Sequence, residues 1–321
     1  MSVDPGTARE AAGPGRWPDF FIVGQAKSGT PALHLMLDQH ERIFMPEIKE
    51  PGFFSNEMFS AAHRGRGISQ ERYLRLFAGA RGDQLAGDAS TQYICSEEAA
   101  DKIAAVRPDA RIIVFFRDPA AFIVSLHLQL VQNRYEPEAD LARALALEDD
   151  RAHGRHVPKM APRPAGLLYT RRARYLEQLR RYERVFPAEQ ILPVIYEDFR
   201  ADNRATLTRI FEFLGVPDDP GIAPVRANPT VQVRSARAQR VLYALSAIQE
   251  TRASRAVTAV ARAVPPDTRR RAVAFARDRL RESTPRDADP VVIAELRARL
   301  RREVAALGEH LNRDLLGLWG Y

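Results

Sequence analysis

Short, continuously apolar runs recur along the first two thirds of the chain, beside stretches in which apolar residues have helical spacing. The runs are Phe20–Val23, Ile112–Phe116 and Ile191–Ile195. Continuous apolar runs of this length between turn residues are typical of strands buried on both faces, as in a parallel sheet. Helical stretches follow the first two runs and precede the third. The pattern predicts an α/β fold with a parallel β-sheet flanked by helices on both faces.

Glycine and proline mark where these elements begin and end. Gly24 ends the first run, and a helix with Leu33–Leu37 on one side follows a loop. Arg117–Pro119 ends the second run and begins another helical stretch, while a helical segment over Tyr169–Phe186 precedes the third run. Pro193 lies inside the third run, and because proline cannot donate to a β-ladder, we expect this strand at a sheet edge or irregular.

The chain divides into regions of different character. Residues 1–16 predict a disordered tail, residues 17–235 the core, and residues 236–321 a helical C-terminal part. Within the core, residues 133–166 are either a lid over an acceptor pocket or a plain surface connection. The last predicted helix has an apolar face that packs on the core or, alternatively, forms a homodimer contact. That face consists of Leu296, Leu300, Val304, Leu307, Leu311 and Leu315.

The net charge of +7 comes mainly from residues 226–302, which hold 18 Arg and no Lys against 7 Asp plus Glu. Arginines spread through Ala-rich helical segments predict solvated helix faces, so no nucleic-acid partner is expected.

No stretch reaches the roughly 18 to 20 apolar residues that span a bilayer, and residues 1–16 lack a signal-peptide core. We therefore expect a cytoplasmic protein without integral membrane contact. The single cysteine, Cys95, excludes an internal disulfide.

The segment Gly24–Pro31, GQAKSGTP, joins the first predicted strand to the first predicted helix. Backbone N–H groups and the helix dipole favour an anion at such a junction. In a Walker A loop the lysine directly precedes the hydroxyl residue, whereas Lys27 stands three positions before Thr30. Arg117 lies at the strand end where a Mg-nucleotide enzyme offers an acidic ligand. The sequence thus predicts a P-loop-like phosphate site without a metal.

Two segments together resemble the sulfotransferases that use 3′-phosphoadenosine 5′-phosphosulfate (PAPS). Residues 18–30 resemble the 5′-phosphosulfate loop of that family, and residues 111–125 resemble its 3′-phosphate motif. In that motif an Arg at a strand end and a Ser eight residues later hold the 3′-phosphate. The resemblance implies PAPS as the donor and a nucleotide-binding role for Gln25, Ala26, Lys27, Ser28, Gly29, Thr30, Pro31, Arg117, Ser125, Asn228 and Arg234.

Two further stretches are similar to the branch that includes bacterial and Golgi-type carbohydrate sulfotransferases. The first is KEPGFF at Lys49–Phe54, where the branch carries its proposed catalytic glutamate, which implies Glu50 as general base. The second is YEDF at Tyr196–Phe199, which we interpret as structural. Asp88 is the reserve base or a group that orients the acceptor. Ala89 stands where heparan-type members have a lysine, which argues against a polyanionic sugar acceptor.

The resemblance implies a metal-independent, in-line sulfuryl transfer to a hydroxyl or amine of a small-molecule, glycolipid or carbohydrate acceptor. Lys27 would stabilise the leaving phosphate, and Glu50, desolvated beside aromatic residues, would take the acceptor proton. A set of five aromatic and apolar residues indicates a partly apolar acceptor or, alternatively, belongs to the hydrophobic core. The set is Phe53, Phe54, Met58, Phe59 and Tyr93.

Two other functions stay open at this point. A P-loop kinase of a small molecule would use the same loop, and a nucleic-acid or membrane-surface adaptor would use the basic C-terminal region. His34 and His127 lie in apolar helical surroundings and are expected to be packed residues. His153 and His156 lie in the 133–166 segment without a nearby carboxylate pair, so a metal site is not expected there.

Overall fold

The computed structural model describes residues 15–225, 232–233, 281–282 and 289–321. Most of the predicted N-terminal tail, the predicted site residues Asn228 and Arg234, and most of the basic region 226–302 lie outside the described residues. A small antiparallel pair, β6 (Gln232–Val233) and β7 (Arg281–Glu282), belongs to a unit of its own.

The predicted parallel sheet is confirmed and has five strands in the order β2-β3-β1-β4-β5. β1 (Phe20–Gly24) lies at its centre, between β3 (Leu85–Asp88) and β4 (Arg111–Phe116). β2 (Ile43–Phe44) forms one edge and β5 (Ile191–Ile195) the other. The edge position of β5 agrees with the expectation from Pro193. β2 and β3 were not predicted.

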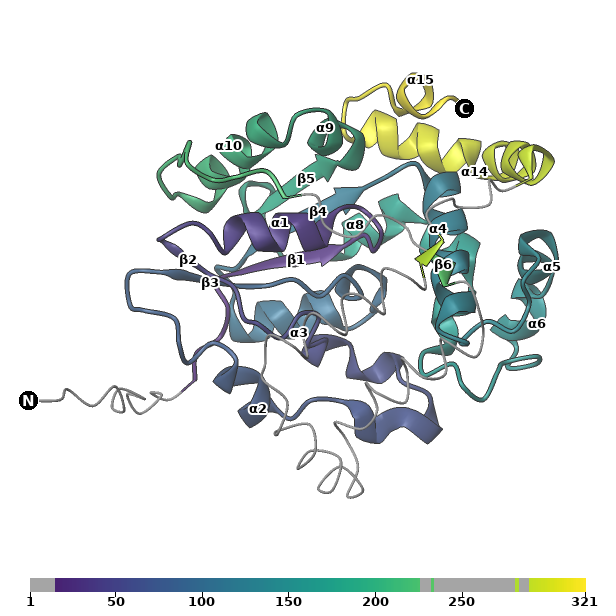
Figure 1. The fold of residues 1–321 in the computed structure, drawn as a ribbon, viewed down its shortest axis with the longest axis horizontal. Coiled ribbons are helices and arrows are strands. Elements are labelled where there is room, and N and C mark those ends of the chain that lie inside the picture. Colours follow the sequence, from purple (N-terminus) through teal and green to yellow (C-terminus); the bar gives the residue numbers. More distant parts are fainter. Residues whose placement is uncertain (1–14, 226–231, 234–280, 283–288) are drawn as a thin grey trace, which may run out of the picture. The chain divides into compact units, whose positions relative to one another are not determined.

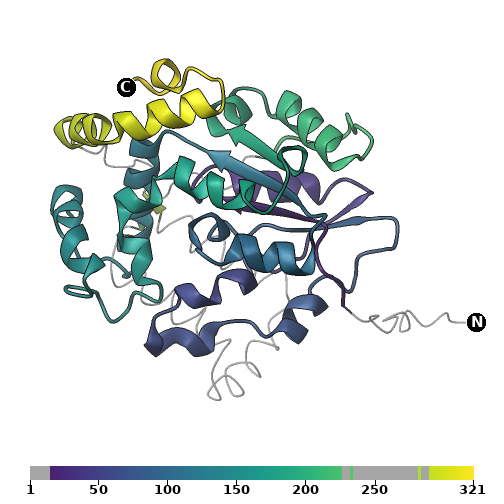
Figure 2. The same ribbon diagram turned by 180° about the vertical axis from the view of Figure 1, so that it is seen from behind.

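Helices cover both faces of the sheet, because side chains alternate between two apolar clusters along each strand. On one face lie α1 (Thr30–Leu37), α9 (Tyr196–Ala201) and α10 (Asn203–Leu214). Figure 1 looks onto α1. On the other face lie α3 (Ala99–Val106), α4 (Pro119–Gln132) and α8 (Tyr175–Glu183); Figure 2 shows α3 and α8 on the near side. No helix of the described residues is long and apolar enough to cross a membrane.

The predicted C-terminal helix packs on the core. It comprises α14 (Pro290–His310) and, after a break, α15 (Leu315–Trp319), so the expectation of one continuous helix through Leu315 was wrong. The buried side chains of α14 are Leu296, Leu300, Val304 and Leu307, and the helix lies against α4 and α8. The apolar face is therefore used within the chain.

The helical segment predicted over Tyr169–Phe186 is also divided, into α7 (Tyr169–Arg172) and α8. The remaining short elements lie mainly in connections. They are α2 (Gln70–Arg75), α5 (Leu141–Ala146), α6 (Glu148–Ala152), and the 3-10 turns η1 (Phe53–Met58), η2 (Ala61–Arg66), η3 (Tyr93–Cys95), η4 (Pro164–Leu167) and η5 (Ala188–Gln190).

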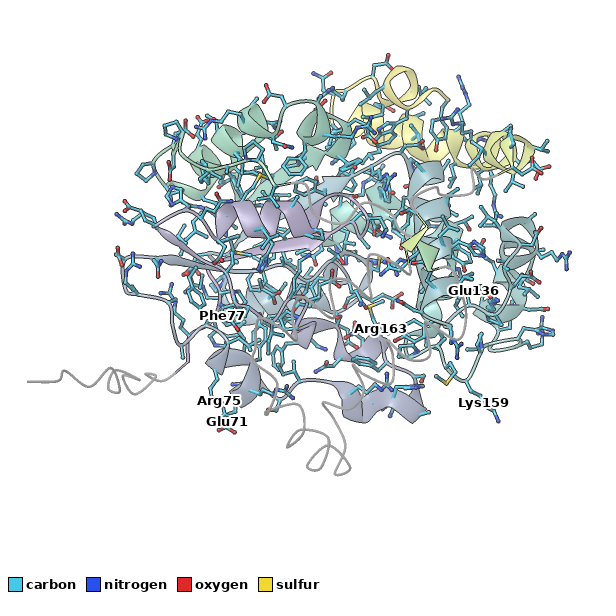
Figure 3. All side chains as sticks on the ribbon, viewed as in Figure 1. Glu71, Arg75, Phe77, Glu136, Lys159 and Arg163 are labelled. Carbon is cyan, nitrogen blue, oxygen red and sulfur yellow. The ribbon has the colours of Figure 1, made fainter. Side chains whose placement is uncertain are left out.

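A buried ion pair anchors the 133–166 segment. Arg151 donates to both carboxylate oxygens of Glu136, at 2.6 and 2.8 Å, and the Tyr169 hydroxyl donates to the same carboxylate at 2.8 Å. Both ends of the pair are buried, and Figure 3 shows Glu136 beside α4. Burial would raise the pKa of Glu136, but the bonds from Arg151, Tyr169 and the Glu138 N–H lower it. The pair lies inside the segment, and Tyr169 joins it to α7. That the segment is a lid or a plain surface connection stays a prediction.

Candidate functional site

The loop between β1 and α1 presents the free N-terminal end of a helix. Gly29 precedes α1 in the left-handed region, with φ at 77° and no side chain capping the helix. A Cβ at Gly29 would lie 3.0 Å from the Phe199 ring, so packing as well as backbone conformation requires glycine. Pro31 occupies the first turn, as expected, and Ser28 and Thr30 are buried. Pro31 has no N–H, and the N–H groups of Ala32 and Leu33 donate to the Gly29 carbonyl oxygen. An anion would therefore meet the N–H of Thr30 and those of the loop before it.

Lys27 stands at the tip of this loop with a left-handed backbone, φ 65°. Its carbonyl oxygen accepts a hydrogen bond of 2.7 Å from the guanidinium of Arg117. Burial lowers the pKa of Lys27, and the charge of Arg117 lowers it further, while the charge of Glu50 opposes both. The predicted loop lysine, strand-end arginine and candidate base therefore lie within electrostatic reach of one another.

Arg117 and Ser125 each keep a buried polar atom without a partner in the described structure. These atoms are Nε of Arg117 and the hydroxyl oxygen of Ser125. The Arg117 guanidinium lies over the Tyr196 ring, 5.0 Å from its centre. A buried donor without an acceptor costs free energy, on the order of 1 to 3 kcal/mol. Both atoms can donate a hydrogen bond to an anion.

Gln25 has a different environment from the rest of the loop. Its side chain is fully buried, and its amide nitrogen donates to the Arg172 carbonyl oxygen at 2.9 Å and to Gln178 at 3.3 Å. The Gln25 amide oxygen accepts from the Ala26 N–H at 3.2 Å. Gln25 and Ala26, both predicted to bind the nucleotide, thus shape the loop through contacts within the protein.

Glu50 reaches the site from the loop after β2. Its backbone is left-handed, with φ 54°, which a residue other than glycine adopts at some cost and which is frequent at functional sites. The Thr91 hydroxyl lies 3.4 Å from one carboxylate oxygen. Glu50 is exposed, so its expected desolvation by Phe53 and Phe54 was wrong. Those two rings pack instead with Trp17 and Tyr73.

Asp88 is fully buried at the end of β3 and accepts three hydroxyl hydrogen bonds. Tyr73 and Tyr93 donate to one carboxylate oxygen and Ser90 to the other, each at 2.7 Å. Burial raises the pKa of Asp88 to about 6 despite these bonds. The Ser90 oxygen in turn accepts the Gly52 N–H at 3.0 Å, two residues after Glu50. Asp88 therefore supports the loop that carries Glu50.

Cationic residues that the sequence analysis did not single out also surround Glu50. Arg163 stacks on the Phe59 ring, with 3.9 Å from its guanidinium carbon to the ring centre, and its Nε has no partner in the described structure. Burial lowers the pKa of Arg163, while the charge of Glu50 raises it; the same two effects act on Lys49. Figure 3 shows Arg163 within the body of the molecule. No spacing rule relates Arg163 to Glu50, so only the fold brings the two charges within reach of each other.

The histidines lie in different surroundings. His127 bonds the Glu138 carbonyl oxygen at 2.9 Å and is a packed residue, as expected. His34 is buried too, and burial first and the charge of Lys49 second lower its pKa. His153 and His156 are exposed and lie 3.8 and 3.5 Å from Asp149 and Asp150, so the expectation that no carboxylate pair lies near them was wrong. The described residues contain no cluster of three or more metal-ligand side chains.

Comparison with known proteins decides the class. Residues 18–220 match the model of the Sulfotransferase family, which is more than half of the chain. The chain belongs to the sulfotransferase family. The resemblance predicted from the Lys27 and Arg117 segments is thus confirmed, together with its placement beside the carbohydrate sulfotransferases.

Among curated sulfotransferases, human heparan sulfate glucosamine 3-O-sulfotransferase 6 is 29% identical over 212 residues, 64% of this chain and 55% of that protein. The human bifunctional heparan sulfate N-deacetylase/N-sulfotransferase 3 is 27% identical over 210 residues, 63% of this chain and 22% of that protein. A solved sulfotransferase from Alicyclobacillus acidocaldarius is 26% identical with a TM-score of 0.66, and the match covers 95% of this chain and all of that one. The chain spans about half the length of the first of these relatives.

Proposed function

We propose that this chain transfers a sulfuryl group from PAPS to a hydroxyl or amine of a small-molecule, glycolipid or carbohydrate acceptor, without a metal. The observation that carries the proposal is the 2.7 Å bond from Arg117 to the Lys27 carbonyl oxygen. This bond joins two segments, each suited to one phosphate end of a nucleotide. The unpartnered Nε of Arg117 and hydroxyl of Ser125 suit the 3′-phosphate, and the open start of α1 suits the 5′-phosphate.

In the proposed reaction, Glu50 takes the proton of the acceptor hydroxyl as the acceptor oxygen forms a bond to the sulfur of PAPS. The bond from sulfur to the 5′-phosphate oxygen breaks on the opposite side, and Lys27 stabilises the negative charge that develops on that oxygen. The exposed carboxylate of Glu50 suits a base that must meet an incoming acceptor. We assign Asp88 a positioning role, because its oxygens accept from three hydroxyl groups and the residue is fully buried.

The surroundings of Glu50 favour an acceptor that carries an anionic group. The aromatic residues expected to line an apolar pocket pack against one another, with Phe53, Phe54 and Tyr73 stacked or edge-on. Arg163 and Lys49, by contrast, are half-buried cations in the field of Glu50. A half-buried guanidinium that stacks on Phe59 keeps its N–H edge free for a carboxylate or sulfate. We propose that Arg163 binds this group of the acceptor.

Calorimetric titration tests the donor class. 3′,5′-Adenosine bisphosphate is titrated into wild type and Arg117→Ala with EDTA present, and ATP with and without Mg²⁺ serves as comparator. The proposal expects metal-free binding of the bisphosphate that is tighter than that of ATP and is lost in Arg117→Ala. Preference for ATP in the presence of Mg²⁺ would instead indicate a P-loop kinase. Transfer of ³⁵S from PAPS to a panel of anionic and neutral hydroxyl acceptors then tests the reaction.

A further inference from the structure

Asp118, the residue after Arg117, contacts residues of the C-terminal segment. The Tyr321 hydroxyl donates to the carboxylate of Asp118 at 2.8 Å and accepts the Ala120 N–H at 3.1 Å. The same Asp118 oxygen caps helix α4 by accepting the Ala120 N–H at 3.0 Å. Arg297 of α14 lies 3.7 Å from the other carboxylate oxygen. The Asp118 carboxylate is thus held by Tyr321, by the start of α4 and by Arg297.

A second contact holds the backbone of the same residue. The Trp319 indole N–H donates to Glu197 at 2.8 Å, and the other carboxylate oxygen of Glu197 accepts the Asp118 N–H at 3.3 Å. Glu197 lies in the YEDF stretch, whose structural interpretation the contacts support. Its neighbour Asp198 pairs with Arg313 at 2.8 and 2.9 Å.

These contacts form a clasp, which we define as Arg313, Trp319 and Tyr321 with their partners Asp198, Glu197 and Asp118. The clasp fixes both the N–H and the carboxylate of Asp118, which lies directly between Arg117 and the start of α4. The orientation of Arg117 and the position of Ser125 on that helix both depend on this start. The matched family region ends at residue 220, so Arg313, Trp319 and Tyr321 lie outside it, whereas their partners lie within it.

We propose that Tyr321 and Trp319 are positioning residues for the 3′-phosphate of the donor nucleotide, an inference that rests on the proposed function. Burial first and the charge of Asp118 second raise the pKa of Tyr321, so its hydroxyl stays protonated and keeps donating. The same bond holds the Asp118 carboxylate at the start of α4, where it accepts the Ala120 N–H. Tyr321 acts through Asp118 and does not touch the nucleotide.

The test compares two nucleotides that differ only in the 3′-phosphate. Dissociation constants of 3′,5′-adenosine bisphosphate and 5′-AMP are measured by metal-free calorimetry for wild type, Tyr321→Phe and Trp319→Phe. Tyr182→Phe is the matched control, because the Tyr182 hydroxyl is buried without a partner in the described structure. Each clasp variant should weaken bisphosphate binding about fivefold, the effect of one hydrogen bond. The clasp variants should bind 5′-AMP as tightly as wild type does, and Tyr182→Phe should bind both nucleotides as wild type does.

The midpoint of thermal unfolding shows whether each variant is folded, which separates a loss of positioning from a loss of folding. A clasp variant that loses affinity for both nucleotides equally has a general structural defect, and this result would overturn the inference. So would a Tyr321→Phe protein that keeps the full wild-type preference for the bisphosphate. Wild type that does not prefer the bisphosphate over 5′-AMP would overturn the proposed donor, and the clasp assignment with it. If Tyr321→Phe does not fold, Trp319→Phe decides the question; it removes the indole N–H that donates to Glu197 together with part of a buried ring, so its thermal midpoint is measured alongside.

Discussion

Arg117 donates to the carbonyl oxygen of Lys27 across 90 residues of sequence. This bond joins the end of β4 to the loop after β1, the two segments proposed to bind the donor nucleotide. The charge of Arg117 also helps to lower the pKa of Lys27, after the larger effect of burial. A negatively charged nucleotide between the two cations would relieve their repulsion, which couples donor binding to the order of the loop.

Lys27→Met should lower kcat by about two orders of magnitude, because one preorganised group that stabilises a leaving oxygen contributes that much. Affinity for 3′,5′-adenosine bisphosphate should fall much less, since the backbone N–H groups of the loop remain. Single-turnover kinetics with labelled PAPS measures the chemical step. Lys159→Met, at an exposed lysine, is the control. Unchanged single-turnover rates in Lys27→Met would contradict the assigned role.

Glu50→Gln should lower kcat by about 10² to 10⁴, the range that general bases supply, with little change in nucleotide affinity. The amide keeps the size of the side chain but cannot take a proton. Glu47→Gln is a matched control, because Glu47 is an exposed glutamate in the same loop. If Glu50→Gln keeps wild-type kcat, the base lies elsewhere.

Arg163→Met should raise the KM of an anionic acceptor about tenfold or more, the effect of losing a charged hydrogen bond. Methionine keeps apolar contact with Phe59 but offers no donor. The KM of PAPS and of neutral acceptors should stay the same. Arg143→Met tests for a general charge effect, since Arg143 is an exposed arginine in the same 133–166 segment. An equal loss for neutral acceptors would argue against an anion subsite.

Asp88 should make the free energy of unfolding fall as pH rises toward neutrality. Its pKa in the folded protein is about 6, against 3.8 for an ordinary aspartate. The folded state therefore holds a proton that the unfolded state releases between these values, so the stabilisation is full below pH 3.8 and lost above pH 6. The change is on the order of 3 kcal/mol.

Urea unfolding of wild type and Asp88→Asn between pH 4 and pH 7 measures this effect. The stability of wild type minus that of the variant should decrease as pH rises. A difference that is constant with pH would show that folding leaves the pKa of Asp88 unchanged, and one that increases would show that folding lowers it; either result would contradict the prediction.

Arg151→Met should destabilise the protein by about 3 to 5 kcal/mol, because it leaves the buried carboxylate of Glu136 without its cation. The double variant Arg151→Met, Glu136→Gln should recover part of that loss, since no buried charge remains. Thermal unfolding of the three proteins measures the difference. Equal stability of single and double variants would mean that Glu136 finds water when Arg151 is removed.

The sequence predicted the parts of the fold that depend on local patterns. Continuous apolar runs identified β1, β4 and β5, and Pro193 identified an edge strand. β3, LAGD, was missed because two of its four residues are glycine and aspartate, which rarely mark a strand. β2 has only two residues and depends on its neighbour for its conformation.

The candidate site also has residues that a local sequence pattern predicts and residues that it does not. Lys27 and Arg117 were found because loop and strand end are each encoded by a short stretch of residues. Arg163 and Tyr321 were missed because their partners lie far away in sequence, and a lone arginine or tyrosine has no local signal of function. The burial of Asp88 under Tyr73 and Tyr93 also depends on tertiary contacts.

The packing of α14 bears on how this enzyme can be shortened. Leu296, Leu300, Val304 and Leu307 cover apolar side chains of α4 and α8, although α14 lies outside the region that defines the family. A protein truncated at residue 220 would leave that surface open to water and to other chains. Shortened or chimeric versions of the protein should therefore keep residues 289–321, because these residues belong to the same compact unit as the matched region.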